Sequence, residues 1–284
     1  MKRSLAITLG IVAIGAGIFA LPHGLAQSVV SVIRVCGADS MAGRIQILTK
    51  VFVKNNPDIK VEILEGGLVD VGIAALVENK CDIAMASRGL TEKESAQAVQ
   101  KGVELVERVI GYGGIVIIAH PQTLVNDLSV DQVRKIFKGE ITRWDQLGGR
   151  TESITVVITD ESRHPGTFVF MESDFLKAKF SKDAVALTQF PGVMAKVGKT
   201  PGAIGYVRIR DAFESKPKVR EAIKVLEIRK EGALVGVMPS RETVNDGLYP
   251  IRRPYYLYYN SKADGNIKKY TDFIVSKGWG PQDL

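Results

Sequence analysis

Short β-branched runs alternate with segments of helical spacing along the first half of the chain, and this alternation restricts the fold more than any other feature. The expected strands are 29–36, 59–64 and 81–86. The expected helices are 43–55, 71–78 and one that begins near Thr91. Thr91 and Glu94 have the spacing of a capping box, which supports that last helix. Such a βαβαβ order predicts a mostly parallel sheet with helices on both faces.

A second set of elements follows a glycine-rich stretch at 111–114, which we interpret as a crossing between two lobes. The expected strands there are 115–119, 154–158 and 203–207, and the expected helices are 130–137, 166–176 and 184–197. A tyrosine-rich strand at 254–259 is placed to return the chain, and a last helix is expected at 266–275. We therefore predict one lobe from 28–114 plus 250–284, and a second lobe from 115–249.

The N-terminal residues 1–26 have the features of a secretory signal peptide. A basic start at Lys2 and Arg3 precedes an apolar stretch at 5–21, and small residues lead up to Ala26. We expect cleavage after Ala26 and a periplasmic or extracellular mature chain. The alternative is an uncleaved anchor, because the apolar stretch is close to the roughly 17-residue lower limit for spanning a bilayer.

The charge of the chain fits an anionic ligand and argues against nucleic acid. The formal net charge is +7, and loss of Lys2 and Arg3 with the leader leaves +5. Basic residues are scattered and are not interleaved with aromatic residues, as they are in single-strand nucleic-acid binders. No nucleic-acid partner is therefore expected.

The two cysteines, Cys36 and Cys81, are expected to be free, buried thiols. Secretion permits a disulfide. However, Cys36 ends one expected strand and Cys81 begins another. In parallel strands in register this places them on the order of 10 Å apart, beyond the roughly 7 Å over which two Cα atoms can be bridged.

The segment 154–175 predicts a small-anion site. An apolar strand leads into a polar loop that carries Arg163 and His164, and Pro165-Gly166-Thr167 then opens a helix. The unpaired backbone donors and the dipole of a helix start attract anions. The two basic side chains add positive charge at the same place.

Three further loops follow expected strands, and the carboxyl ends of parallel strands are where such sheets bind ligands. Ser40 and Asp70 have a simpler alternative role as helix caps, and Arg88 has one as a solvated surface charge. Arginine nevertheless suits an oxyanion, because its planar guanidinium matches oxygen pairs. The candidate ligand-binding residues from all four loops are Asp39, Ser40, Met41, Asp70, Ser87, Arg88, Arg163, Gly166 and Thr167.

Four stretches resemble the phosphate-binding proteins of phosphate ABC transporters, of the short type. They are DIAMASR at 82–88, IFKGEITRW at 136–144, TPGAIGYV at 200–207 and YPIRRPYYLY at 249–258. The resemblance spans the mature chain. It implies a type II-like periplasmic-binding-protein fold of two α/β lobes around a hinge, which captures phosphate or a related oxyanion. It also implies a monomer that passes the ligand to an inner-membrane ABC permease.

The resemblance is weaker in the expected pocket. Val69 and Val71 stand where the family has hydroxyl donors, Glu161 stands in place of an arginine, and Pro165 removes a backbone donor. Each missing partner of a desolvated anion costs roughly 1–3 kcal/mol. The alternative function is therefore a non-transport interaction or sensing module with a degraded anion pocket.

Neither metal binding nor catalysis is expected. His120 and His164 lack ligand spacing relative to the cysteines. Ser40 and Ser87 have no histidine nearby in sequence to act as a base. We expect no cofactor and no enzymatic activity.

Overall fold

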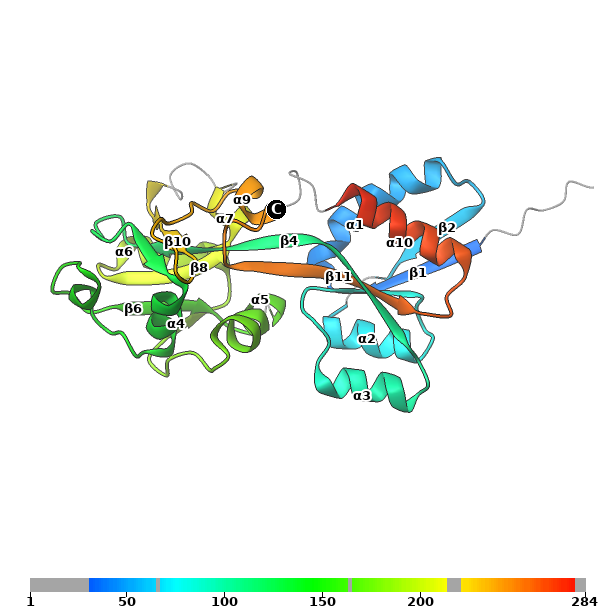
Figure 1. Cartoon of the computed structure of the whole chain (residues 1–284), viewed down its shortest axis with the longest axis horizontal. Helices are drawn as coiled ribbons and strands as arrows, with labels where there is room; N and C mark the ends of the chain where they lie inside the picture. The colour runs from blue at the N-terminus through cyan, green and yellow to red at the C-terminus, as the bar shows by residue number, and fades with distance from the viewer. Residues whose placement is uncertain (1–30, 65–66, 163–164, 214–220, 279–284) are drawn as a thin grey trace, which may run out of the picture.

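The computed structural model describes residues 31–64, 67–162, 165–213 and 221–278. The expected signal peptide at 1–26 lies outside the described residues. Among the residues that are described, no helix is long and apolar enough to cross a membrane. Two lobes are joined by two long strands, β4 and β11 (Figure 1).

The first lobe is a five-stranded sheet between two pairs of helices. Its strands are β1 (Ser31–Gly37), β2 (Ile59–Ile63), β3 (Ile83–Ala86), and parts of β4 (Leu105–Ala119) and β11 (Arg252–Asn260), in the order β2-β1-β3-β11-β4. Its helices are α1 (Asp39–Lys54), α2 (Val69–Val77), α3 (Glu92–Gln100) and α10 (Gly265–Lys277). Strands β1, β2 and β3 are parallel, as expected. Helices α1 and α10 cover one face and α2 and α3 the other (Figure 1).

The packing of this lobe follows from its helix faces. Phe52 of α1 lies edge-to-face against Tyr270 of α10, with ring centroids 5.0 Å apart. The hydroxyl of Tyr270 is 2.6 Å from that of Thr49, so its polar end is paired inside the core. The capping box of α3 is present as predicted: Thr91 accepts from the Glu94 backbone, and the Glu94 carboxylate accepts from the Thr91 backbone.

The second lobe repeats the layered arrangement. Its sheet order is β4-β8-β6-β7, with β9 beside β4 and a separate parallel pair of β5 and β10. Its strands are β5 (Asp127–Ser129), β6 (Thr155–Thr159), β7 (Val185–Leu187), β8 (Ala203–Arg208), β9 (Lys224–Val225) and β10 (Glu227–Arg229). Its helical segments are α4 (Val130–Lys138), η1 (Trp144–Leu147), α5 (Pro165–Val169), η2 (Phe170–Leu176), α6 (Phe190–Lys199), α7 (Ile209–Phe213) and α9 (Arg241–Asn245).

Two expected elements of the second lobe differ from the structure. The expected helix 184–197 is instead strand β7 followed by helix α6, which has Pro191 at its start. Proline fits the first turn of a helix, where its missing N–H has no intrahelical partner. The expected helix 166–176 begins as α5 and continues as the π-helical segment η2.

The two lobes share the continuous strand β4. The glycines expected to separate two elements lie inside this 15-residue strand. Gly111 has a φ of 153° beside a register shift between Tyr255 and Tyr256 of β11, and glycine adopts this conformation at little cost. The residues up to Gly114 pair with β11, and those from Ile115 pair with β8. The expected lobe boundaries, at 114/115 and 249/250, fall inside β4 and two residues before the start of β11. This division of the chain stays a prediction.

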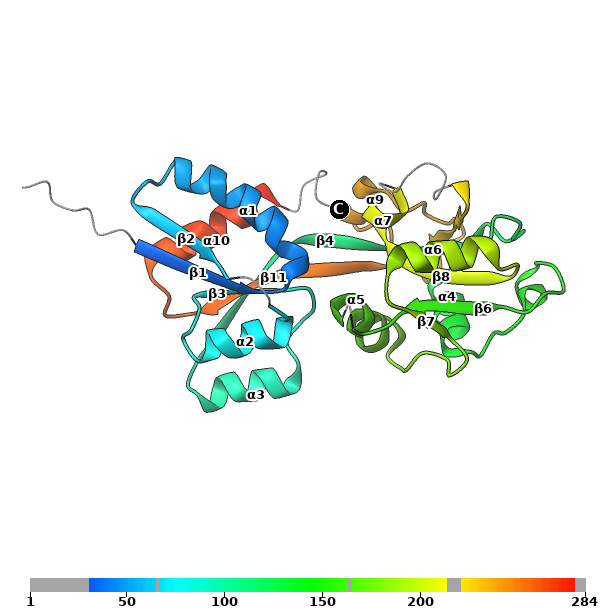
Figure 2. The same ribbon diagram turned by 180° about the vertical axis from the view of Figure 1, so that it is seen from behind.

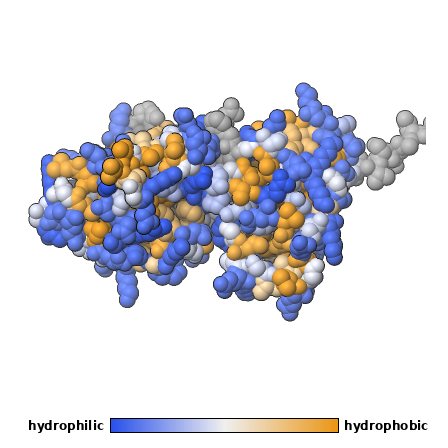
Figure 3. All heavy atoms as spheres, viewed as in Figure 1, coloured by the Kyte–Doolittle hydropathy of each residue, from blue (hydrophilic) through white to orange (hydrophobic). Residues whose placement is uncertain are grey.

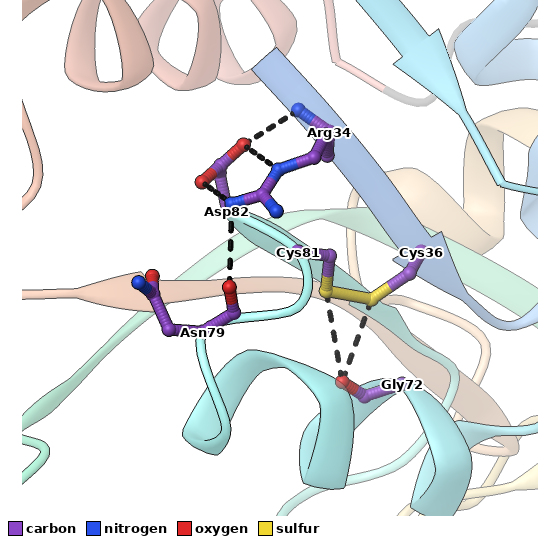
Figure 4. Close-up of a disulfide and its surroundings, with 6 residues drawn as sticks. All are labelled: Arg34, Cys36, Gly72, Asn79, Cys81 and Asp82. Atoms are coloured by element: carbon purple, nitrogen blue, oxygen red, sulfur yellow. Dashed lines mark hydrogen bonds and ion pairs between the residues drawn. A yellow bond between two sulfur atoms is a disulfide. The ribbon is translucent and has the colours of Figure 1, made fainter.

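The expectation of two free thiols is wrong, because Cys36 and Cys81 form a disulfide with Cα atoms 6.2 Å apart. Strand β3 begins at Ile83, so Cys81 lies in the connection from α2 and not in line with the strand. Both sulfur atoms face α2, 3.4 and 3.9 Å from the carbonyl oxygen of Gly72 (Figure 4). The distance estimated from strand register therefore does not apply.

An ion pair holds the chain beside this disulfide. Arg34 Nε and Nη2 donate to the two carboxylate oxygens of Asp82 at 3.0 and 2.8 Å, and the Arg34 backbone N–H donates at 2.7 Å (Figure 4). Burial acts to raise the pKa of Asp82, but these bonds outweigh it and hold the pKa below its usual value. The entry into β3 is thus fixed to β1 by one covalent and one ionic contact.

Candidate functional site

A cavity of about 340 Å³ lies between the two lobes, and all four predicted loops contribute to it. The surface is hollowed between the lobes in the space-filling view (Figure 3). The first lobe contributes Ala38, Asp39, Ser40, Gly67, Leu68, Val69, Asp70, Ser87 and Arg88. The second lobe contributes Glu161, Gly166, Thr167, Val169 and Arg208, and strand β11 contributes Arg253.

Glycines bring the first two loops into direct backbone contact. A Cβ on Gly67 would lie 2.3 Å from the carbonyl oxygen of Gly37, and one on Gly72 would lie 2.5 Å from the Gly37 Cα. Gly37 has a φ of 102° and lies equally close to Met85. Only glycine fits such contacts, and the loops after β1 and β2 therefore meet at one end of the sheet.

Neither Ser40 nor Asp70 caps a helix, so the capping alternative for both is wrong. Helix α1 begins at Asp39, four residues before the expected start, and its N-cap Ala38 makes no side-chain cap bond. The exposed Ser40 therefore lies in the first turn of α1 and reaches the cavity. Helix α2 begins after Leu68, which puts Asp70 at its second residue, on the cavity wall.

Asp39 holds the second loop in place. Its Oδ1 accepts a hydrogen bond from the Gly67 backbone N–H at 3.0 Å, while the Asp39 N–H donates to the Gly67 carbonyl at 3.1 Å. This reciprocal pair explains why a carboxylate lies at the edge of a candidate anion site. Its second oxygen remains available to accept a proton from a ligand.

Arg88 lines the cavity, but its guanidinium is held by Glu94. Nη1 and Nη2 donate to the two carboxylate oxygens at 2.8 Å each, and Nη1 also donates to the Gly89 carbonyl. Burial acts to raise the pKa of Glu94, but the hydrogen bonds from Arg88 and Thr91 outweigh it and lower the pKa. The hydrogen bond with Glu94 raises the pKa of Arg88. The positive charge of Arg88 is thus compensated within the first lobe.

The start of α5 lies against the first lobe. Figures 1 and 2 show α5 on the side of the second lobe that faces the first. A Cβ on Gly166 would lie 2.3 Å from the Ser87 hydroxyl oxygen, so the two lobes approach closely here. Ser87 and Thr167 both line the cavity and are only 2% and 3% exposed, so both side chains are shielded from solvent.

One predicted contact, Met41, is not brought to the cavity, and another, Arg163, stays a prediction. Met41 is fully buried in the core and does not line the cavity. Arg163 lies outside the described residues, as does His164. Val71, which was expected to weaken the pocket, is 54% exposed and is not part of the lining.

Two arginines of the cavity wall, Arg208 and Arg253, were not predicted from the sequence. Arg208 ends β8 and pairs through Nε and Nη2 with both carboxylate oxygens of Asp211. Arg253 lies in β11, and its Nη1 donates to Thr167 Oγ1 at 3.0 Å. A signal for Arg253 was present: successive side chains of a strand point to opposite faces, so one of two adjacent arginines must point inward.

The part of the chain that the structure describes holds no group of three or more histidine, cysteine, aspartate or glutamate residues able to bind a metal ion. The cavity offers serine and threonine hydroxyls, guanidinium groups and carboxylates. This set of groups suits a small oxyanion that carries a proton, because it can both donate and accept hydrogen bonds.

A family model described as PBP superfamily domain matches residues 24–277. The chain belongs to the PBP superfamily. Among its relatives, the Phosphate-binding protein PstS of Bacillus subtilis is 28% identical over 246 residues, which cover 86% of this chain and 75% of that protein. The protein of the same name from Borreliella burgdorferi is 26% identical over 215 residues, 72% of this chain and 71% of that protein.

Similar solved structures confirm the expected two-lobed fold. PstS from Borrelia burgdorferi superposes with a TM-score of 0.68 at 23% identity, covering 87% of this chain and 96% of that one. An ABC-type phosphate transport receptor from Vibrio cholerae gives 0.67 at 24% identity, covering 86% and 93%. These likenesses show the fold.

Proposed function

We propose that this chain is a solute-binding protein that captures inorganic phosphate, or a related oxyanion, for delivery to an inner-membrane ABC permease. The observation that carries this proposal is the cavity that both lobes and β11 line with hydroxyls and guanidinium groups. The names of the relatives, Phosphate-binding protein PstS, support the same ligand. In this function the chain is a monomeric receptor without a cofactor and not an enzyme.

The ligand contacts in this proposal come from both sides of the cavity. Ser40 and Ser87 donate from the first lobe, and Gly166 and Thr167 from the second, with Arg88 beside them. Asp39 and Asp70 face an ion that carries a proton, such as hydrogen phosphate, and accept a hydrogen bond from it. Fully ionised sulfate has no proton to offer, so the same carboxylates repel it.

The apolar part of the wall sets a limit on affinity. Leu68, Val69 and Val169 line the cavity without hydrogen-bond donors. Val71, by contrast, is exposed outside the lining, so its replacement of a hydroxyl costs the site nothing. The loss of donors is therefore smaller than the sequence alone suggests.

Calorimetry on the mature chain tests the ligand. We expect phosphate and arsenate to bind with micromolar or lower Kd, and sulfate to bind at least a hundredfold more weakly. Ser40→Ala removes one hydroxyl at an exposed position of α1 and is expected to weaken phosphate binding by roughly tenfold. Ser95→Ala, at an exposed serine of α3 outside the cavity lining, is the matched control and is expected to bind as the unaltered chain does.

The result that contradicts this function is a lack of heat with all three anions from a folded chain. That outcome favours the alternative, a non-transport interaction or sensing module on the same scaffold.

Localisation is tested separately. Mass spectrometry of the chain exported by its host is expected to find Gln27 as the first residue, which would establish cleavage after Ala26.

A further inference from the structure

Among the residues that the structure describes, three arginines line the cavity, and they differ in how their charge is compensated. Arg88 is bonded through both terminal nitrogens to Glu94, and Arg208 is bonded through two nitrogens to Asp211. Arg253 makes no ion pair with any of the described residues. It is therefore the cavity arginine whose positive charge has no counter-charge in direct contact.

Arg253 is also the most deeply buried of the three, with 2% of the residue exposed. Nη1 donates to Thr167 Oγ1 at 3.0 Å and Nη2 to the Tyr255 hydroxyl at 3.1 Å. The guanidinium lies over the Tyr255 ring, 5.2 Å from its centroid. Its Nε is buried and finds no hydrogen-bond partner among the described residues.

These contacts leave the guanidinium incompletely satisfied. Arginine has five N–H donors, and the two bonds to hydroxyls use two of them. A buried cation with unpaired donors and no carboxylate in direct contact is unfavourable unless something else supplies the negative charge. Since Arg253 is part of the cavity wall, an anion in the cavity is the group that can supply it.

We propose that Arg253, on the hinge strand β11, is the guanidinium that binds the oxyanion in this cavity. The anion accepts hydrogen bonds from the donors that Thr167 and Tyr255 leave free. Arg88 and Arg208 instead hold the walls through their own carboxylate partners. This inference rests on the proposed function and assigns the central contact of that site.

The position of Arg253 also places the bound anion at the connection between the two lobes. Strand β11 is one of the two strands that join the lobes, while Thr167, its hydrogen-bond partner, belongs to the second lobe. Gly166, next to Thr167, lies against Ser87 of the first lobe, and its Cβ position is 3.3 Å from Arg253 Nη1. An anion bound to Arg253 therefore touches the hinge at the point where the two lobes meet.

The test compares two adjacent arginines of the same strand. Arg253→Gln removes the charge from the cavity, and Arg253→Lys keeps the charge but loses the paired geometry. Arg252→Gln is the matched control: Arg252 stacks on Tyr112, 3.9 Å from its ring centroid, and is not part of the cavity lining. Phosphate affinity is measured by calorimetry, and folding of each variant by thermal denaturation.

We expect Arg253→Gln to weaken phosphate binding by about a hundredfold or more, because charge-assisted hydrogen bonds are lost. Arg253→Lys is expected to retain part of the affinity, and Arg252→Gln to stay within about threefold of the unaltered chain. Phosphate affinity that survives Arg253→Gln overturns the inference but leaves the proposed function intact. Absence of oxyanion binding by the unaltered chain overturns both.

A second measurement covers the case in which Arg253→Gln does not fold. The Nε–H resonance of Arg253 in the unaltered, nitrogen-15-labelled chain is identified by its loss in Arg253→Lys. We expect this resonance to shift on addition of inorganic phosphate and to remain unchanged with chloride at the same ionic strength. An unchanged resonance at saturating phosphate shows that Arg253 is a structural residue and contradicts the inference.

Discussion

The buried pair of Arg88 and Glu94 allows a specific prediction about both stability and ligand affinity. Their side chains are 12% and 9% exposed and share two hydrogen bonds of 2.8 Å. Glu94→Gln keeps the size of the side chain and an oxygen that can accept from the Thr91 backbone, but it removes the negative charge. Breaking a buried pair by changing one partner costs roughly 3–5 kcal/mol, and we expect about 3 kcal/mol because one acceptor remains.

The same change is expected to strengthen anion binding. With Glu94→Gln, the charge of Arg88 on the cavity wall is no longer compensated by a carboxylate in direct contact. At an effective dielectric constant near 20, one added charge on the order of 10 Å away contributes about 1–2 kcal/mol before screening by salt. We therefore expect phosphate binding to tighten by roughly three- to tenfold at low ionic strength.

The stabilisation of the fold by Glu94 is expected to depend on pH. The folded-state pKa of Glu94 lies below the ordinary value of 4.5, so the unfolded chain binds the proton more readily. The stabilisation by Glu94 is fully present above pH 4.5 and is lost as the pH falls through the lower folded-state value. The difference in unfolding free energy between the unaltered chain and Glu94→Gln should shrink over this acidic range.

Urea denaturation from pH 7 down to pH 3 measures the stability, and calorimetry at low and high salt measures the affinity. Glu92→Gln, at an exposed first-turn carboxylate of α3, is the matched control for loss of one negative charge. Two results refute the reasoning: equal stability of Glu94→Gln and the unaltered chain at pH 7, or weaker phosphate binding by a folded Glu94→Gln chain.

Two further predictions concern the disulfide and the contact between the lobes. Replacing both Cys36 and Cys81 by alanine opens a 45-residue loop and should lower the unfolding free energy by about 3–4 kcal/mol. Urea denaturation measures this change, and an unchanged midpoint would contradict a disulfide in solution. Gly166→Ala places a Cβ against the Ser87 hydroxyl and should weaken phosphate binding roughly tenfold. In a Ser87→Ala background the same change should cost clearly less, and an equal cost in both backgrounds would show that these residues do not meet.

The sequence predicted the four cavity loops because strand ends and turns have strong local signals. Ser40, Asp70, Ser87 and Thr167 all follow expected strands, and the parallel sheet brings such ends together. Arg253 was missed because it lies inside a strand and not in a loop that follows one. Its inward orientation depends on which face of β11 meets the second lobe, and that is a tertiary property.

The disulfide was missed for a different reason. The chain leaves α2 through Asn79, which has a positive φ of 57°, and Cys81 follows this turn and faces the helix. Asparagine is one of the few residues that adopt this conformation readily, so a turn was detectable, but its direction was not. The boundary between β7 and α6 was easier to predict from the sequence, because Pro191 marks a helix start within the single helix that we expected.

The uninterrupted course of β4 has a consequence for how the molecule loses its structure. The same strand supplies hydrogen bonds to β11 in one lobe and to β8 in the other. No loop separates these two halves of β4, so unfolding of either lobe frees the end of a strand that the other lobe still holds. The two halves should consequently melt together in a single cooperative step, despite the narrow waist that joins them.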